Sequence, residues 1–415
     1  TDHAEASTPR KWKEIKESVR QCNAPADSKD PDMVTFLGYE WTQVGLYAED
    51  HYGHKNVMFL DTEEGKVPLR PIGAGGVATD GMRETIGGQA DQFKPLAFMD
   101  FKNRHRYFNF ISFTQEFSGI PHCELGVDSS LLPEDCYEYA HTPVELFTKL
   151  NQLNFPSIVI PHGNAWGFYS PPLTSLDKQL QKGFHDENVQ ILFEVMSGHG
   201  NSEEYRPWRA AILNDDGSIG CPEPTIEYLP SCWRAGEIIA ERCLAEGHSE
   251  TICQTRELEA RNNYLALGSS GYLAIPGAEI EDWYDSGQCK DCFIPSFNYR
   301  PAGSGQYALS LTNFDQEQPK RFRFGFIASS DNHRARPGTG YKEKDRFVTT
   351  EANGPSSEAI AKALYPKSLP ISNSLDFGGR EGLIGMGFRA FEVERQASFF
   401  TSGGLAAVHS SGRDR

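Results

Sequence analysis

Several short apolar segments of this chain end abruptly at a histidine or a carboxylate. The pattern is clearest in residues 321–338, RFRFGFIASSDNHRARPG, where a run of β-forming residues stops at Asp331 and His333. The same residue types border three further apolar runs: Glu40 after 34–39, His54 before 55–60 and His162 after 157–160. Strand, polar terminus, loop and helix in repetition predict an α/β barrel or sheet whose site lies at the strand ends.

These side chains offer the donor atoms that transition metals bind in proteins. One barrel would bring them together in space: Glu40, His54, His162, Asp331 and His333. Imidazole nitrogens and carboxylate oxygens are ligands for Zn, Mn or Fe. The alternative is that each residue is an ordinary hydrogen-bonded or surface side chain. A serine nucleophile is disfavoured because the sequence has no Gly-x-Ser-x-Gly segment.

Helix signals surround the apolar runs. Thr8 and Pro9 open an amphipathic pattern, and Thr142 to Glu145 form a capping box with proline at the first helical position. Residues 234–245 predict a further helix that ends before Gly247. The pattern loses its regularity in residues 61–139 and 220–313, which we interpret as insertions in a single domain spanning residues 1–415.

The net charge restricts the partners of the chain. A formal charge of −17 disfavours nucleic acid and an anionic membrane surface, because both require clustered Lys and Arg. The sequence contains no apolar run of transmembrane length and no signal-peptide pattern. The expected partner is therefore a small molecule, and the oligomeric state stays open.

Nine cysteines are many for a cytosolic chain, and eight of them lie between Cys123 and Cys292. We expect structural disulfides in an exported protein, periplasmic or secreted, with at least one pair in residues 221–292. Free buried thiols are the alternative. Cys289 and Cys292 are spaced as half a zinc site, a redox pair or a disulfide.

Five motifs together resemble the polymerase and histidinol phosphatase (PHP) superfamily, and they look like a large bacterial branch of it that is catalogued as a domain of unknown function. They are Thr1-Asp2-His3, Gly38-Tyr39-Glu40, His54-Lys55-Asn56-Val57, Ile160-Pro161-His162-Gly163 and Ser330-Asp331-Asn332-His333. The resemblance implies a distorted (β/α)7 TIM-type barrel with two or three divalent metal ions, Zn, Mn or Fe. It also implies metal ligands: His3, Glu40, His54, His162, Asp331 and His333, among which Glu40, Asp331 and His333 would serve catalysis.

The family normally begins with a His-x-His strand upstream of the Thr-Asp-His motif, and that strand is missing here. The chain is therefore expected to be truncated, to bind metal weakly and to show little activity by itself.

The predicted function is metal-dependent hydrolysis with a metal-activated water. Phosphoesters are the substrate class that the resemblance favours, and Lys55, Arg334 and Arg336 beside the ligands are candidates for holding an anionic group. Carbamate or carboxylic ester cleavage at the same site is the first alternative. A non-catalytic ligand-binding barrel is the second, because a fold does not guarantee a function.

Overall fold

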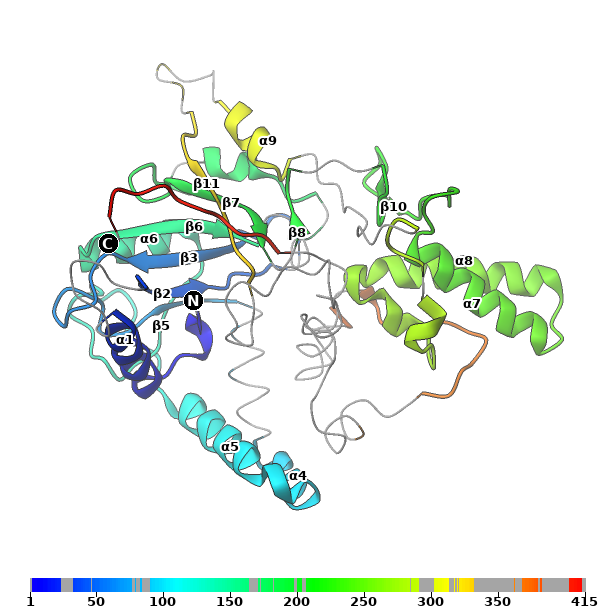
Figure 1. Cartoon of the computed structure of the whole chain (residues 1–415), viewed down its shortest axis with the longest axis horizontal. Helices are drawn as coiled ribbons and strands as arrows, with labels where there is room; N and C mark the ends of the chain where they lie inside the picture. Colours follow the sequence, from blue (N-terminus) through cyan, green and yellow to red (C-terminus); the bar gives the residue numbers. More distant parts are fainter. Residues whose placement is uncertain are drawn as a thin grey trace.

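A computed structural model covers the chain, and Figure 1 shows its arrangement. The structure describes residues 2–23, 33–45, 47–76, 90–163, 173–181, 183–197, 200–203, 207–283, 285–290, 302–312, 321–331, 368–379 and 403–412, with a few single positions between them.

Strands from the first half of the chain form a four-stranded sheet. It contains β1 (Asp2–His3), β2 (Leu37–Trp41), β3 (His54–Phe59) and β6 (Ser157–His162), in the order β1-β2-β3-β6. β1 runs parallel to β2, whereas β3 is antiparallel to both β2 and β6. Because β3 is reversed, its first residue lies at the same edge as the last residues of its neighbours. His54 is accordingly opposite His162.

One face of this sheet forms the main hydrophobic core. Side chains alternate between the two faces of a strand, and the core face of β2 and β3 carries buried apolar residues: Leu37, Tyr39, Trp41, Val57 and Phe59. Helices α1 (Pro9–Asn23) and α6 (Pro143–Leu153) add Trp12, Leu146 and Leu150 to the same core. Burial of each large apolar side chain contributes about 1.5–3 kcal/mol, so this core dominates the stability of the region.

The predicted N-cap of α6 is confirmed at Thr142, but the reciprocal bond of the capping box goes to His141 instead of Thr142. Thr142 accepts a hydrogen bond from the Glu145 backbone N–H at 3.3 Å, and the Glu145 carboxylate accepts one from the His141 N–H at 2.7 Å. The helix ends at Leu153, and the next residue, Asn154, has a left-handed φ of 54° that stops further helical hydrogen bonding.

A second sheet lies beside β6. It contains β11 (Gly325–Ala328), β7 (Leu192–Ser197) and β8 (Gly200–Asn201), with β11 parallel to β7 and β8 antiparallel to it. Figure 1 shows β6, β7 and β11 stacked in neighbouring positions. The Val159 N–H donates to the Val189 carbonyl at 2.9 Å, which ties β6 to the segment that leads into β7.

The described strands form open sheets. Two further sheets are small: β4 (Ile72–Ala74) with β5 (Glu138–Ala140), and β9 (Ile212–Leu213) with β10 (Ile219–Gly220). The architecture is mixed α/β, and no sheet of the described residues closes into a barrel. The (β/α)7 barrel stays a prediction.

The two segments predicted as insertions contain most of the remaining helices. The first holds η3 (Ala90–Phe93), α4 (Lys94–Met99), η4 (Phe101–Asn103) and α5 (Arg104–Gly119); the second holds α7 (Ser231–Ala245), α8 (Glu250–Ala266), η6 (Gly268–Ala274), η7 (Ile280–Trp283) and α9 (Gly305–Ser310). The short helices η1 (Ala4–Ala6) and η5 (Leu176–Leu180) lie outside both. No helix of the described residues has both the length and the apolar character to cross a membrane.

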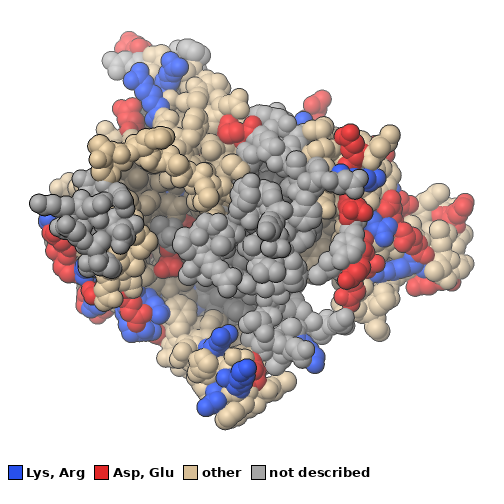
Figure 2. Space-filling model, viewed as in Figure 1, with Lys and Arg blue, Asp and Glu red and all other residues tan. Residues whose placement is uncertain are grey.

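Helices α7 and α8 pack as a pair with a core of their own. Ile238 and Ile239 on α7 are buried against Ala260 and Tyr264 on α8. Helix α7 begins three residues before the predicted start, directly after Pro230, and Gly247 follows its end with a φ of 83°. Figure 2 shows acidic and basic side chains interspersed over this helix pair, as expected for a solvated surface.

Three disulfides crosslink the described residues: Cys123–Cys136, Cys221–Cys232 and Cys243–Cys253. The predicted pair within residues 221–292 is confirmed, and Cys22 is a free, exposed thiol. Cys292 lies outside the described residues. These pairs are consistent with an extracellular location.

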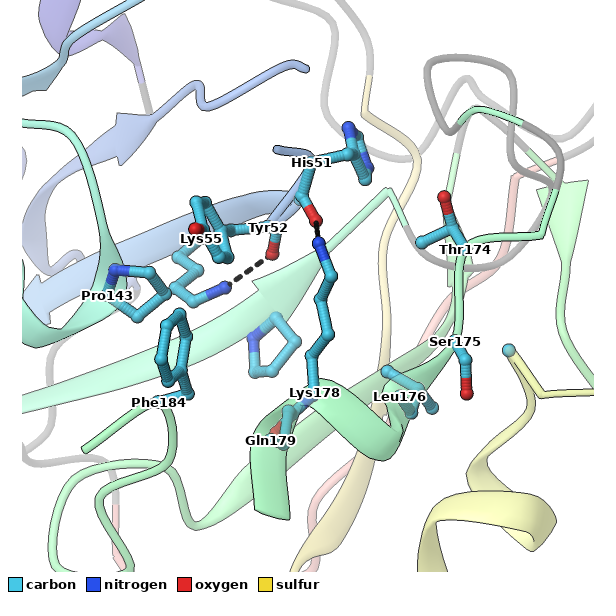
Figure 3. Close-up of a pocket in the computed structure, with 13 residues that line it drawn as sticks. His51, Tyr52, Lys55, Pro143, Thr174, Ser175, Leu176, Lys178, Gln179 and Phe184 are labelled. Carbon is cyan, nitrogen blue, oxygen red and sulfur yellow. Dashed lines mark hydrogen bonds between the residues drawn. The ribbon is translucent and has the colours of Figure 1, made fainter. Parts of the chain in front are cut away.

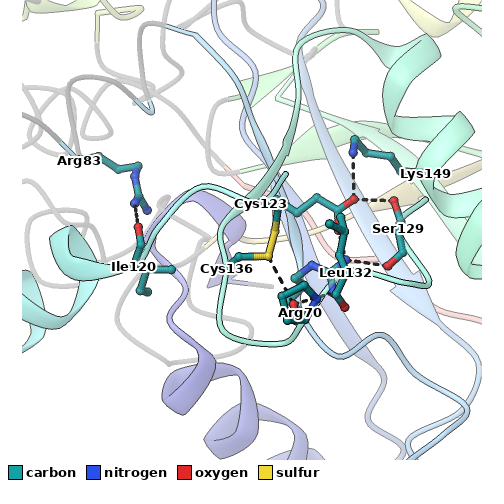
Figure 4. Close-up of a disulfide and its surroundings, with 10 residues drawn as sticks. Arg70, Arg83, Ile120, Cys123, Ser129, Leu132, Cys136 and Lys149 are labelled. Carbon is teal, nitrogen blue, oxygen red and sulfur yellow. Dashed lines mark hydrogen bonds and ion pairs between the residues drawn. A yellow bond between two sulfur atoms is a disulfide. The ribbon is translucent and has the colours of Figure 1, made fainter. Parts of the chain in front are cut away.

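The Cys123–Cys136 disulfide borders a buried ion-pair cluster (Figure 4). Glu138, which is 2% exposed, receives the Arg70 guanidinium at 2.7 Å and the Lys149 ammonium at 2.9 Å. Ser129 donates to the same carboxylate at 2.5 Å. We call Arg70, Ser129, Glu138 and Lys149 the Glu138 cluster.

Candidate metal centre

The face of the central sheet opposite the core carries polar side chains. Trp41 and Lys55 point to the core side, so Glu40 and His54 point to the other face. The register places His3 beside Glu40 and His54 beside His162. Four strands thus deliver one polar side chain each to a single region.

The donor atoms of three of these residues lie close together. One donor atom each from Glu40, His54 and His162 lies within 4.8 Å of the other two, and all three residues are buried. The Glu40 Oε1 is 2.8 Å from His54 Nδ1 and 3.7 Å from His3 Nδ1. The Glu40 Oε2 is 3.9 Å from His162 Nε2.

Asp331 reaches the same region from the second sheet. It follows β11 at the carboxyl end, and its Oδ2 lies 3.5 Å from His162 Nε2. Its φ of 44° is left-handed, a conformation that Asp tolerates better than most residues. We call His3, Glu40, His54, His162 and Asp331 the Glu40 cluster.

Glu194 on β7 contacts the ring nitrogen of His162 that faces away from Glu40, and so orients the ring. Its Oε2 lies 2.5 Å from His162 Nδ1 and accepts the Gly163 N–H at 3.3 Å, while Ser329 donates to Oε1. A carboxylate on one ring nitrogen leaves the other, Nε2, turned toward Glu40 and Asp331. Carboxylates commonly hold metal-binding histidines in this way.

His3 and Glu5 anchor the opposite side of the cluster. The His3 Nδ1 is 2.7 Å from the Thr42 hydroxyl. The fully buried Glu5 carboxylate accepts the backbone N–H groups of Thr42 at 3.0 Å and Ala74 at 2.5 Å. Burial raises the pKa of Glu5, and the charge of His3 opposes that rise. Glu5 therefore fixes the end of β2 on which Glu40 is carried.

The cluster shifts the protonation of its own members. Burial opposes the charged form of Glu40, but His3, His162 and His54 outweigh burial and lower the pKa of Glu40. Burial likewise lowers the pKa of His162, but Glu194, Asp331 and Glu40 raise it well above 6.5. The pKa of His3 is also raised, because Glu40 and Glu5 outweigh burial. Burial lowers the pKa of His54.

The donor set fits a divalent cation. Two imidazoles and one carboxylate, all buried, converge at one place, and this is the mixture of ligands that Zn, Mn and Fe accept. A cation at this point would neutralise Glu40 directly. The Glu40, His54 and His162 group can hold a metal ion.

The sequence predicted Lys55 beside these residues, and the structure contradicts that position. It neighbours His54 along β3 and therefore points to the opposite face, where its Nζ donates to the Tyr52 carbonyl at 2.9 Å. Figure 3 shows it in a separate pocket. His333, Arg334 and Arg336 lie outside the described residues.

Two positions escaped the sequence-based prediction. Glu194 lies inside an apolar run, and its position as the only charged residue there was the available signal. Glu5 had no signal, since it follows the Thr-Asp-His motif in an acidic, irregular stretch. Only the fold shows that both carboxylates support the cluster.

The chain matches no family model, no curated protein and no solved structure with which it was compared. The resemblance to the PHP superfamily accordingly stays a prediction.

Proposed function

We propose that the chain is a metal-dependent hydrolase that uses a metal-activated water, with phosphoesters as its substrate class. The observation that supports this proposal most is the buried Glu40, His54 and His162 donor set on one face of the central sheet. Motifs that resemble the PHP superfamily supply the same residues.

A divalent ion in such a site supplies Lewis acidity and lowers the pKa of water toward neutrality. The residues of the chain prepare the place for it. Glu194 holds the His162 ring so that Nε2 faces Glu40 and Asp331. Thr42 holds His3 at the opposite side. Because these partners fix the donors in advance, binding requires little further ordering of side chains.

The finer features of the proposal follow the resemblance. His3, Asp331 and His333 would complete a site for two or three ions, and Arg334 and Arg336 would hold an anionic substrate group. The Asp331 carboxylate lies 3.5 Å from His162 Nε2 and so is near enough to share an ion with it. The disulfides support a periplasmic or secreted location.

Turnover measurements test the proposal. The chain is loaded with Zn²⁺ or Mn²⁺ and assayed on phosphomonoesters, phosphodiesters, carbamates and carboxylic esters. We expect phosphoester cleavage, slow in this chain by itself as the resemblance implies, that disappears in Asp331→Ala and persists in Asp216→Ala, an exposed turn aspartate that serves as a matched control. If only the carbamates or carboxylic esters are cleaved, phosphoesters are not the substrate class. Metal binding without any turnover would indicate a binding protein. Unchanged turnover in Asp331→Ala would refute its catalytic role.

A further inference from the structure

A second polar pocket lies on the core side of β3, across the sheet from the Glu40 cluster. Thirteen residues line it. They come from residues 51–55, from Pro143 and Pro161, from residues 174–184 around η5, and from Gly303. Figure 3 shows the side chains of Lys55 and Lys178 approaching the same turn from different elements. The Lys55 Nζ donates to the Tyr52 carbonyl at 2.9 Å, and the Lys178 Nζ donates to the His51 carbonyl at 2.9 Å.

The two lysines bring positive charge into this pocket without a matching carboxylate. Lys55 is only 3% exposed. Among the described residues, no carboxylate lies within 4.0 Å of either ammonium group. Glu49 and Asp50 act on Lys178 only from a distance, and Asp50 is already occupied by the Tyr47 N–H at 2.9 Å. Each ammonium group also lies over an aromatic ring, Lys55 over Trp41 at 5.5 Å and Lys178 over Tyr52 at 4.8 Å. Carbonyls and rings leave the charge without a counterion, so an anion from outside would be stabilising.

The remaining lining suits an oxyanion. The Gln179 amide adds a hydrogen-bond donor to the lining, whereas the hydroxyls of Thr174 and Ser175 already donate to the Pro171 carbonyl at 2.8 Å and to Asp177. The nearby Asp177 carboxylate is engaged by the Tyr307 hydroxyl at 2.6 Å and by Ser175. The rings of Tyr52 and Phe184, 5.2 Å apart, form an apolar wall.

The size of the pocket limits the ligand. Its free space is about 50 Å³, far below the roughly 300–1,000 Å³ of sites for drug-sized molecules. The enclosed space suits a single phosphate, sulfate or short carboxylate group and is too small to enclose a whole nucleotide.

We propose that this pocket binds one compact oxyanion between Lys55 and Lys178. The proposal is independent of the metal centre, since the two sites occupy opposite faces of the sheet. Phosphate, sulfate and acetate share the required chemistry and differ in geometry and charge, so that a titration distinguishes them.

The experiment uses the full chain after treatment with EDTA, so that anions cannot be held by a metal. Inorganic phosphate, sulfate and acetate are titrated at constant ionic strength, with chloride as the reference, by calorimetry and by the melting temperature. Saturable binding is expected, weakened about tenfold or more in both Lys55→Met and Lys178→Met because each loses a charged hydrogen bond. Lys66→Met, at an exposed lysine that pairs with Glu63, is the matched control and should bind like the wild type.

Lys55→Met should also raise the melting temperature in anion-free buffer, because it removes a buried cation while keeping the apolar stem. If Lys55→Met fails to fold, the half-buried Lys178→Met still decides the question. Absence of binding by all three anions, or equal binding by the wild type and both variants, would overturn the proposal.

Discussion

The Glu40 cluster and the Glu138 cluster both bury a carboxylate, but they surround it with different partners. Glu138 meets two permanent cations, Arg70 and Lys149, and a hydroxyl donor. Glu40 meets imidazoles, which are charged only when protonated, and a second carboxylate, Asp331, lies on the far side of His162. At neutral pH, the negative charge of Glu138 is paired with permanent positive charges. The negative charge of Glu40 is paired only when the imidazoles are protonated or a cation is bound.

This difference separates a structural site from a binding site. Arg70 also donates to the carbonyls of Leu132, Pro133 and Ser129, so it joins the loop closed by Cys123–Cys136 to β5. A cluster of this kind fixes one conformation. In the Glu40 cluster, imidazole nitrogens and carboxylate oxygens instead point toward one place. This arrangement stabilises the fold less than permanent ion pairs do, but it suits a metal ion. The comparison predicts opposite responses to the same substitutions.

The largest expected effect is on stability at the Glu138 cluster. Glu138→Gln leaves Arg70 buried without its charge partner and should lower the free energy of unfolding by about 3–5 kcal/mol. Urea denaturation followed by circular dichroism measures it. Metal affinity, measured on the folded variant, should be unchanged. A loss of metal affinity equal to that of a Glu40 variant would remove the distinction between the clusters.

The Cys123–Cys136 disulfide should contribute almost as much. Replacing both cysteines by alanine should destabilise the chain by about 3 kcal/mol, since the bond closes a short loop in the unfolded state. The Glu138 cluster should loosen with it, because Ser129 and the Leu132 carbonyl lie in that loop. Hydrogen exchange at β5 reports the loosening. The comparison would fail if exchange rose at β2 and β3 instead.

Glu194 tests the support of the metal site. Glu194→Gln keeps the shape of the side chain but weakens its bond to His162, and it should lower metal affinity about 10–100-fold. Calorimetric titration with Zn²⁺ measures it, and Glu187→Gln, at an exposed residue near the start of the same segment, is the control. An unchanged metal affinity in Glu194→Gln would show that His162 binds metal without being oriented by the Glu194 carboxylate.

The smallest expected effect is on the pH dependence of stability. Above pH 6.5 His54 is neutral in both states, whereas His3 and His162 have raised pKa values in the folded state. Their contribution is present below pH 6.5 and is lost as the pH rises through the folded pKa values. The metal-free chain should therefore lose stability with rising pH, while stabilisation by added metal grows because ligands bind as neutral imidazoles. Parallel curves with and without metal would contradict this.

The sequence predicted the members of the Glu40 cluster better than their surroundings. Histidines and carboxylates at strand ends form a pattern, and strand pairing explains why His54, at the start of a reversed strand, joins His162 at the end of another. Glu40 lies within β2 rather than after it, since the strand continues to Trp41.

Other features had no local signal. Arg70 and Glu138 lie far apart in an irregular segment, so that only tertiary packing pairs them. The predicted position of Lys55 beside the metal ligands was wrong, because residues adjacent in sequence lie on opposite faces of a strand. The closed barrel depends on long-range strand pairings that short motifs do not specify, and the described strands form open sheets.

The most direct test of the central claim compares metal binding by two isosteric variants. Glu40→Gln and Glu138→Gln each remove one buried negative charge, and both are brought to equilibrium with Zn²⁺ or Mn²⁺ by dialysis and analysed for bound metal by mass spectrometry. Circular dichroism confirms that each variant is folded. The account predicts that the wild type and Glu138→Gln retain equal amounts of metal and that Glu40→Gln retains at most about a tenth, because it loses a charged ligand. Equal retention by Glu40→Gln and the wild type would contradict a metal site at Glu40, His54 and His162.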